Sequence, residues 1–147
     1  MRPRDDDGGR RREDDGDMTT VELNHTIVAA TDKQASARFL AHILDIELAD
    51  PWGPFQPVTV GNGVTLEFLD SDDVHPQHYA FLVAADDFDA IFGRIRAAGV
   101  GFYADPFRQD PGRINHAYGG RGVYFDDPDG HILEVITRPY GPAPEPL

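Results

Sequence analysis

The feature that most constrains this chain is an internal repeat. Residues 24–32 read NHTIVAATD, and residues 77–86 read QHYAFLVAAD, which is the same pattern with one residue inserted. Each copy opens a half of the chain in which an apolar, β-prone run with a histidine is followed by a similar run with a glutamate. These runs are 23–30 and 64–69 in the first half, and 77–85 and 131–136 in the second. Such a repeat predicts two similar supersecondary modules.

Each half is predicted to follow the order βαβββ, which makes the chain an α+β protein. The first half has a helical apolar stripe after residue 32, then expected strands near 47–49, at 56–60 and at 64–69. The second half has a helix after residue 86, then expected strands near 100–103, across 115–125 with an interruption at Gly119 and Gly120, and at 131–136. The predicted organisation is a disordered, charged tail over 1–17 and a single domain over 18–140. Within it, module one spans about 21–70 and module two about 77–138, and a C-terminal tail follows over 141–147.

Four ionisable side chains are set into these strands. Because side chains alternate faces along a strand, each shares a face with small or apolar neighbours and can point away from the face that a helix covers. His25, Glu67, His78 and Glu134 are therefore expected to converge in one cleft and bind a divalent metal. Two imidazoles and two carboxylates suit Ni, Co, Mn, Fe(II) or Zn, and the sequence does not choose among them. The alternative is that each side chain is satisfied separately, for example with Glu67 exposed at an edge.

Composition narrows the class of partner and the compartment. The 147 residues carry a net charge of -13, which repels nucleic acid and anionic membrane surfaces. The chain has no cysteine, so thiolate metal sites and disulfides are excluded. No apolar run approaches a membrane span or a signal-peptide core. We therefore expect a cytoplasmic protein whose partner is a small molecule, and neither nucleic acid nor membrane.

The two histidine runs and the segment 120–134, GRGVYFDDPDGHILE, resemble the vicinal-oxygen-chelate superfamily. This superfamily includes glyoxalase I, bleomycin-resistance proteins and extradiol dioxygenases, and the resemblance covers about 21–138. It implies paired βαβββ modules that form a half-open, mixed β-barrel cleft around a divalent metal. The set His25, Glu67, His78 and Glu134 matches the ligand positions of bacterial glyoxalase I. The smaller set without Glu67 resembles the site of extradiol dioxygenases and fosfomycin-resistance enzymes.

The resemblance implies a glyoxalase-like metalloenzyme of the lyase or isomerase type. Its metal would act as a Lewis acid on a chelated, small oxygenated substrate, and Glu134 or Glu67 would act as general base. Two alternatives stay open. One is a metal-free protein that sequesters an aromatic antibiotic, as bleomycin-resistance proteins do, and the other is an extradiol dioxygenase.

Further residues are expected at the substrate cleft and at a subunit interface. The expected cleft residues, which are mostly aromatic, are Trp52, Phe55, Tyr103, Phe107, His116, Tyr118 and Arg121. A curved, four-stranded sheet leaves an edge strand uncovered, and the resemblance implies that a two-fold partner closes it. We expect a homodimer whose pockets are bordered by both chains.

Overall fold

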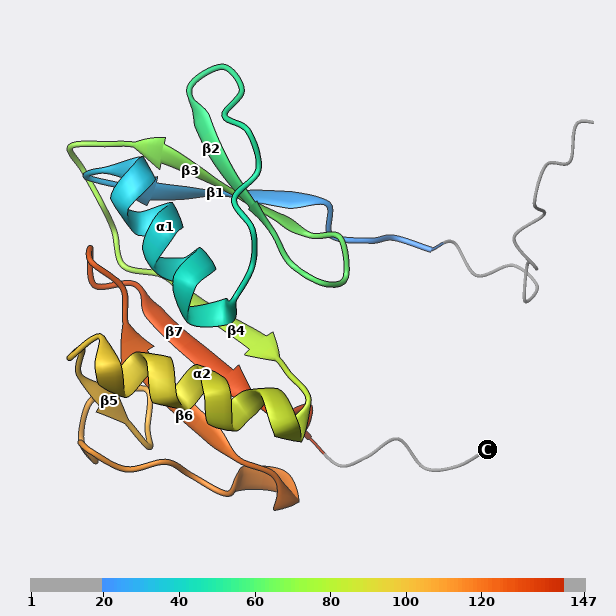
Figure 1. Ribbon diagram of the computed structural model, residues 1–147, viewed down its shortest axis with the longest axis vertical. Coiled ribbons are helices and arrows are strands. Elements are labelled where there is room, and N and C mark those ends of the chain that lie inside the picture. Colours follow the sequence, from blue (N-terminus) through green and yellow to red (C-terminus); the bar gives the residue numbers. More distant parts are fainter. Residues whose placement is uncertain (1–19, 142–147) are drawn as a thin grey trace, which may run out of the picture.

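The computed structural model describes residues 20–141 and contains two modules, each made of one sheet and one helix (Figure 1). The first module contains β1 (His25–Ala30), α1 (Lys33–Leu44), β2 (Phe55–Thr59) and β3 (Thr65–Asp70). The second contains β4 (His78–Leu82), α2 (Ala85–Ala97), β5 (Phe102–Tyr103), a 3-10 turn (Ala117–Gly119), β6 (Gly122–Asp126) and β7 (Ile132–Ile136). The predicted 1–17 tail, and the predicted 141–147 tail beyond its first residue, lie outside the described residues.

The two sheets repeat one topology. Their strand orders are β1-β3-β2 and β4-β7-β6-β5. In both sheets the first strand of the module lies at the edge and runs parallel to the last strand. Ile27 pairs with Glu67 in the first sheet, and Ala80 pairs with Glu134 in the second. The α+β class and the module repeat predicted from the sequence are thus confirmed.

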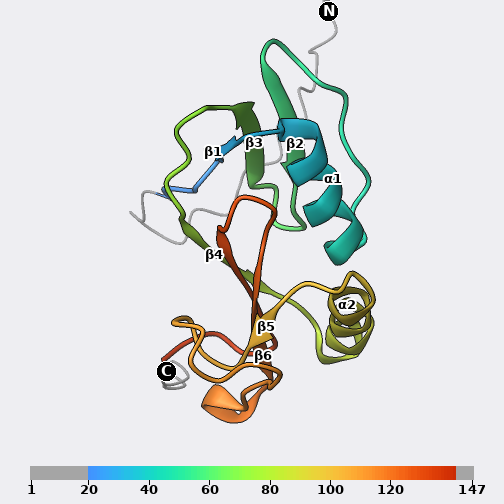
Figure 2. The ribbon, with the colours of Figure 1, turned by 90° about the vertical axis from the view of Figure 1, so that its left-hand side faces the viewer.

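Each helix covers one face of its sheet, and both helices lie on the same side of the molecule (Figures 1 and 2). Helix α1 begins at the N-cap Asp32, whose side chain accepts a hydrogen bond from the Ala35 backbone N–H at 3.1 Å. Its C-cap is Asp45, which adopts a left-handed conformation with φ 55°. The backbone N–H of Asp45 donates to the carbonyls of Ala41 and His42 in the last turn. Neither helix in residues 20–141 is long and apolar enough to cross a membrane.

The core lies between the helices and the sheets. Alternate residues of the strands point into it, and burying each large apolar side chain contributes about 1.5–3 kcal/mol. The buried strand residues include Val28, Leu66 and Phe68 of the first module and Phe125, Leu133 and Val135 of the second. The intervening positions, which carry the predicted ligands, lie on the opposite faces of the sheets.

Two predicted strands differ from the structure. No strand forms near 47–49, so the first sheet has three strands in the described chain. The Gln56 side chain donates to the carbonyl of Ala49 at 2.9 Å. This carbonyl therefore has a side-chain hydrogen-bond partner in place of a neighbouring strand. The predicted 115–125 strand, which was expected to be interrupted at 119–120, is shorter, because a 3-10 turn forms at Ala117–Gly119 and strand β6 begins only at Gly122.

The loop between β6 and β7 reaches back to the first module (Figure 2). Asp129 accepts hydrogen bonds from Thr31 Oγ1 at 2.7 Å and from Ser36 Oγ at 3.1 Å, and also from the Thr31 backbone N–H. His131 is 1% exposed, and its Nδ1 accepts from the Gln77 N–H at 2.9 Å. Its Nε2 therefore carries the proton and donates to the carbonyl of Ala29 at 2.8 Å. These bonds fix the orientation of one module relative to the other.

We predict that Asp129→Ala lowers the free energy of unfolding by about 1–3 kcal/mol, because Thr31 and Ser36 lose their shared acceptor. Urea denaturation measures the change. Asp72→Ala is the matched control, since Asp72 is an exposed linker residue whose side chain makes no hydrogen bond to residues 20–141. A loss for Asp129→Ala no larger than that of the control would contradict a role in joining the modules.

Candidate metal centre

The second module brings two predicted ligands together. His78 lies on β4 and Glu134 on the adjacent β7, on the same face of the sheet. The distance from His78 Nε2 to Glu134 Oε1 is 3.0 Å. The Glu134 side chain is 0% exposed, whereas the His78 side chain is 44% exposed and opens to solvent. The pair therefore offers one imidazole nitrogen and one carboxylate oxygen at the edge of a sheet.

Two tyrosines complete the surroundings of Glu134. Tyr140 donates its hydroxyl hydrogen bond to Glu134 Oε2, and the hydroxyl oxygens of Tyr124 and Tyr140 are 2.5 Å apart. The Tyr124 ring stacks on the His78 ring at a centroid distance of 5.8 Å. Burial first, and then the hydrogen bond to Glu134, raise the pKa of Tyr140 far above its ordinary value. Burial also raises the pKa of Tyr124, so both phenols stay protonated and act as hydrogen-bond donors at neutral pH.

The first module holds the other two predicted ligands, each with a different partner. His25 is exposed on the edge strand β1, where its Nδ1 lies 2.8 Å from Asn24 Oδ1. Glu67 is 7% exposed, and both its oxygens accept from Trp52 Nε1, at 3.2 and 3.3 Å. Trp52 packs on Phe55 with their ring centroids 4.9 Å apart. Each module thus has a glutamate on its open face that aromatic side chains cover.

The four predicted ligands do not converge in one chain. Among residues 20–141, no group of three histidine, aspartate or glutamate side chains lies close enough to hold a metal ion. His78 and Glu134 form one pair, while His25 and Glu67 lie on the sheet of the other module. Their assignment as metal ligands stays a prediction.

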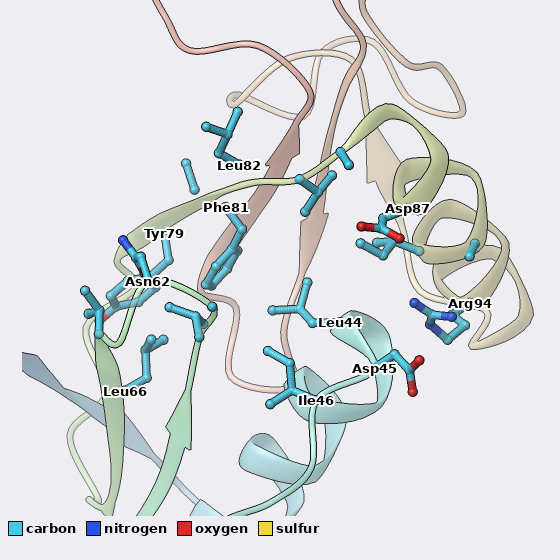
Figure 3. Close-up of a pocket in the computed structure, with 18 of the residues that line it drawn as sticks. Leu44, Asp45, Ile46, Asn62, Leu66, Tyr79, Phe81, Leu82, Asp87 and Arg94 are labelled. Atoms are coloured by element: carbon cyan, nitrogen blue, oxygen red, sulfur yellow. The ribbon is translucent and has the colours of Figure 1, made fainter.

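A groove of about 890 Å³ separates the two modules on one side of β4. Figure 3 shows Leu44 at the end of α1, Ile46 just after it, Phe81 from β4, and Asp87 and Arg94 from α2 around it. Every residue of β4, including His78, lines this groove. The edge of β4 is therefore open along its length.

None of the predicted cleft residues lines this groove. Trp52 and Phe55 lie instead beside Glu67, and the Tyr118 ring packs on Tyr140 at 5.1 Å. Tyr103 pairs with Tyr124 across β5 and β6. The other three have different surroundings. Phe107 is 77% exposed, His116 precedes the 3-10 turn, and Arg121 binds Asp89 and packs over Phe88 of α2.

Sequence reasoning missed Tyr124 and Tyr140. The signal for Tyr124 was available, because it lies opposite Glu134 in the hairpin of β6 and β7 and so shares its face. Tyr140 follows Pro139 beyond the last strand, and no periodic pattern predicts where such a residue folds back.

The model of the Glyoxalase/Bleomycin resistance protein/Dioxygenase superfamily matches residues 22–135. The chain is 34% identical over 120 residues to glutathione transferase FosA of Serratia marcescens, a match that covers 77% of this chain and 78% of that protein. Among solved structures, Oxidase ChaP-H2 is 64% identical, with a TM-score of 0.81 over 83% of this chain and 97% of that chain.

A mutant of the fosfomycin resistance protein FosX from Listeria monocytogenes, in complex with Mn(II) and 1S,2S-dihydroxypropylphosphonic acid, is 21% identical. Its TM-score is 0.65 over 82% of this chain and 95% of that chain, a likeness that shows the fold alone. The family match and the identity to FosA establish that the chain belongs to the Glyoxalase/Bleomycin resistance protein/Dioxygenase superfamily.

Proposed function

We propose that this protein is a metal-dependent oxidase whose divalent metal is held by His78 and Glu134 of one chain and by His25 of a second copy. The observation that carries the proposal is the His78–Glu134 pair, in which an imidazole nitrogen and a fully buried carboxylate oxygen lie 3.0 Å apart. Two donors of this kind fit part of a metal site, and they are incomplete without a third.

The position of His25 supports its role as that third ligand. In the sheets that residues 20–141 form, its strand β1 and the His78 strand β4 are both edge strands, and an edge strand can pair with another chain. Large apolar side chains along these edges are exposed, among them Ile27 at 52% and Leu82 at 60%. Pairing of β1 with β4 of a second copy would cover both edges and bring His25 beside that copy's His78. A two-fold axis would repeat the contact and produce two equivalent sites.

The proposed ligand set is two histidines and one carboxylate. This set with open positions is typical of non-haem Fe(II) oxygenases. When bound, the metal would act as a Lewis acid on substrate oxygens and as a site for oxygen chemistry. The 64% identity to a structure named Oxidase ChaP-H2 favours oxidation over the other reactions of the superfamily.

The chain's own residues would prepare the site. Burial of Glu134 beneath Tyr124 and Tyr140 excludes water from the carboxylate, and the stacking on Tyr124 orients the His78 ring. Glu67 would face the cleft from the first module, where the bonds from Trp52 fix its carboxylate. It is the candidate general base, because Glu134 would be occupied as a ligand.

The second candidate function is a lyase or isomerase reaction, in which Glu67 moves a proton on a chelated substrate without oxygen consumption. The burial of Glu67 on the open face of its sheet favours this role. Oxygen uptake by the iron-loaded protein with catechol as the probe separates the two functions. The third candidate function is metal-free binding of an antibiotic, and the measurement of metal content described below separates it from the two enzymatic functions.

We predict that His25→Ala and His78→Ala each lower metal affinity by orders of magnitude, because each removes a nitrogen ligand. Metal content after dialysis against Mn(II), and calorimetric titration, measure the loss. His75→Ala is the matched control, since His75 is an exposed histidine bonded to Asp73 in the linker. Wild-type protein that takes up no stoichiometric metal would refute the proposed enzyme, and a loss confined to His78→Ala would exclude His25.

We also predict a homodimer in dilute solution, because the metal site needs a second copy. Sedimentation equilibrium at micromolar concentration should give about twice the chain mass of 16.2 kDa. A mass equal to a single chain under these conditions would contradict the shared site.

A further inference from the structure

The carboxylate of Glu134 has two oxygens, and the structure gives them different partners. Oε1 lies 3.0 Å from His78 Nε2, whereas Oε2 accepts the hydrogen bond from the Tyr140 hydroxyl. Glu134 is fully buried, so water does not compete for either oxygen. One oxygen of the carboxylate is therefore directed at His78, and the other is occupied by Tyr140.

The Tyr140 hydroxyl is itself held in place from several sides. The Tyr124 hydroxyl lies 2.5 Å from it, and the Tyr118 ring packs against the Tyr140 ring at 5.1 Å. Tyr124 is fixed in turn by its pairing with Glu134 across β6 and β7 and by its stacking on His78. The chain just before Tyr140 is anchored as well, because Thr137 exchanges hydrogen bonds with Arg121.

We infer that Tyr140 is a positioning residue that reserves Glu134 Oε2, so that the carboxylate presents only Oε1 to the metal. This inference rests on the proposed metal site. A carboxylate held in this way cannot rotate to offer both oxygens, and the coordination position that a second oxygen would take stays open for substrate. Hydrogen bonds from neighbouring residues to metal ligands typically change metal affinity by about 10–100-fold.

The chain provides a graded series of variants to test this role. Tyr140→Phe removes the hydroxyl that donates to Glu134 Oε2, and Tyr124→Phe removes the neighbouring hydroxyl, which is 2.5 Å from that of Tyr140 and also interacts with Glu134. Tyr118→Phe is the matched control, because Tyr118 packs on Tyr140 through its ring and its hydroxyl makes no hydrogen bond to residues 20–141. All three substitutions keep the aromatic ring, and thermal unfolding of each variant verifies that it is folded.

The readouts are the Mn(II) dissociation constant by calorimetry and the visible absorption spectrum of the Co(II)-loaded protein, which reports ligand number and geometry. We expect Tyr140→Phe to weaken Mn(II) binding by about 10–100-fold and to change the Co(II) spectrum. Tyr124→Phe should have a smaller effect of the same kind, and Tyr118→Phe should match wild type. A purely structural role for Tyr140 would lower the unfolding midpoint and leave the spectrum unchanged.

Several outcomes would overturn the inference. A Mn(II) affinity and a Co(II) spectrum in Tyr140→Phe that both equal those of wild type would overturn it alone. An equal loss in Tyr118→Phe would show that ring packing, and not the hydroxyl, is responsible. Wild-type protein that binds neither ion would remove the proposed function together with this inference. If Tyr140→Phe does not fold, wild-type behaviour of Tyr124→Phe would still count against the role of the hydroxyl pair.

Discussion

The site depends on the burial of one charged group, the carboxylate of Glu134, which is 0% exposed on the open face of a sheet. An ionised carboxylate removed from water costs several kcal/mol unless hydrogen bonds or an opposite charge compensate it. His78 supplies one such contact and Tyr140 another, with Tyr124 behind it. A divalent cation at Oε1, beside His78, would supply the strongest compensation. The proposed metal would therefore account for the burial of this carboxylate.

The module repeat explains why a single chain would hold only part of the proposed site. In each module the first strand lies at one edge of the sheet, so within residues 20–141 each histidine strand has a single strand neighbour. The contacts of Asp129 and His131 across the modules fix how these edges are directed within one chain. His25 is thereby left on an exposed edge, away from the pair that it would complete. Assembly of two copies, as proposed, would cover the edges and complete the ligand set together.

Much of this arrangement was predictable from the sequence, because strand alternation and repetition are local signals. The runs around His78 and Glu134 predicted both strands and the shared face of the two side chains, and the structure places them 3.0 Å apart. The separation of His25 and Glu67 from that pair was not predictable, since alternation assigns a face within a sheet but not which sheets meet. Tyr140 was missed because it follows the last strand in a segment without periodicity. The strand expected near 47–49 does not form, and the carbonyl of Ala49 accepts a hydrogen bond from the Gln56 side chain instead.

The most direct test of the shared site is subunit complementation between His25→Ala and His78→Ala chains that carry different affinity tags. In the purified heterodimer, one site loses both histidines, and the other combines the intact His25 of one chain with the intact His78 of the other. Each parent homodimer should bind no metal, and the heterodimer should recover about half of the wild-type metal content, because the two-fold axis gives two sites of which one is intact. A metal-free heterodimer alongside metal-binding wild-type protein would contradict a site built from two chains.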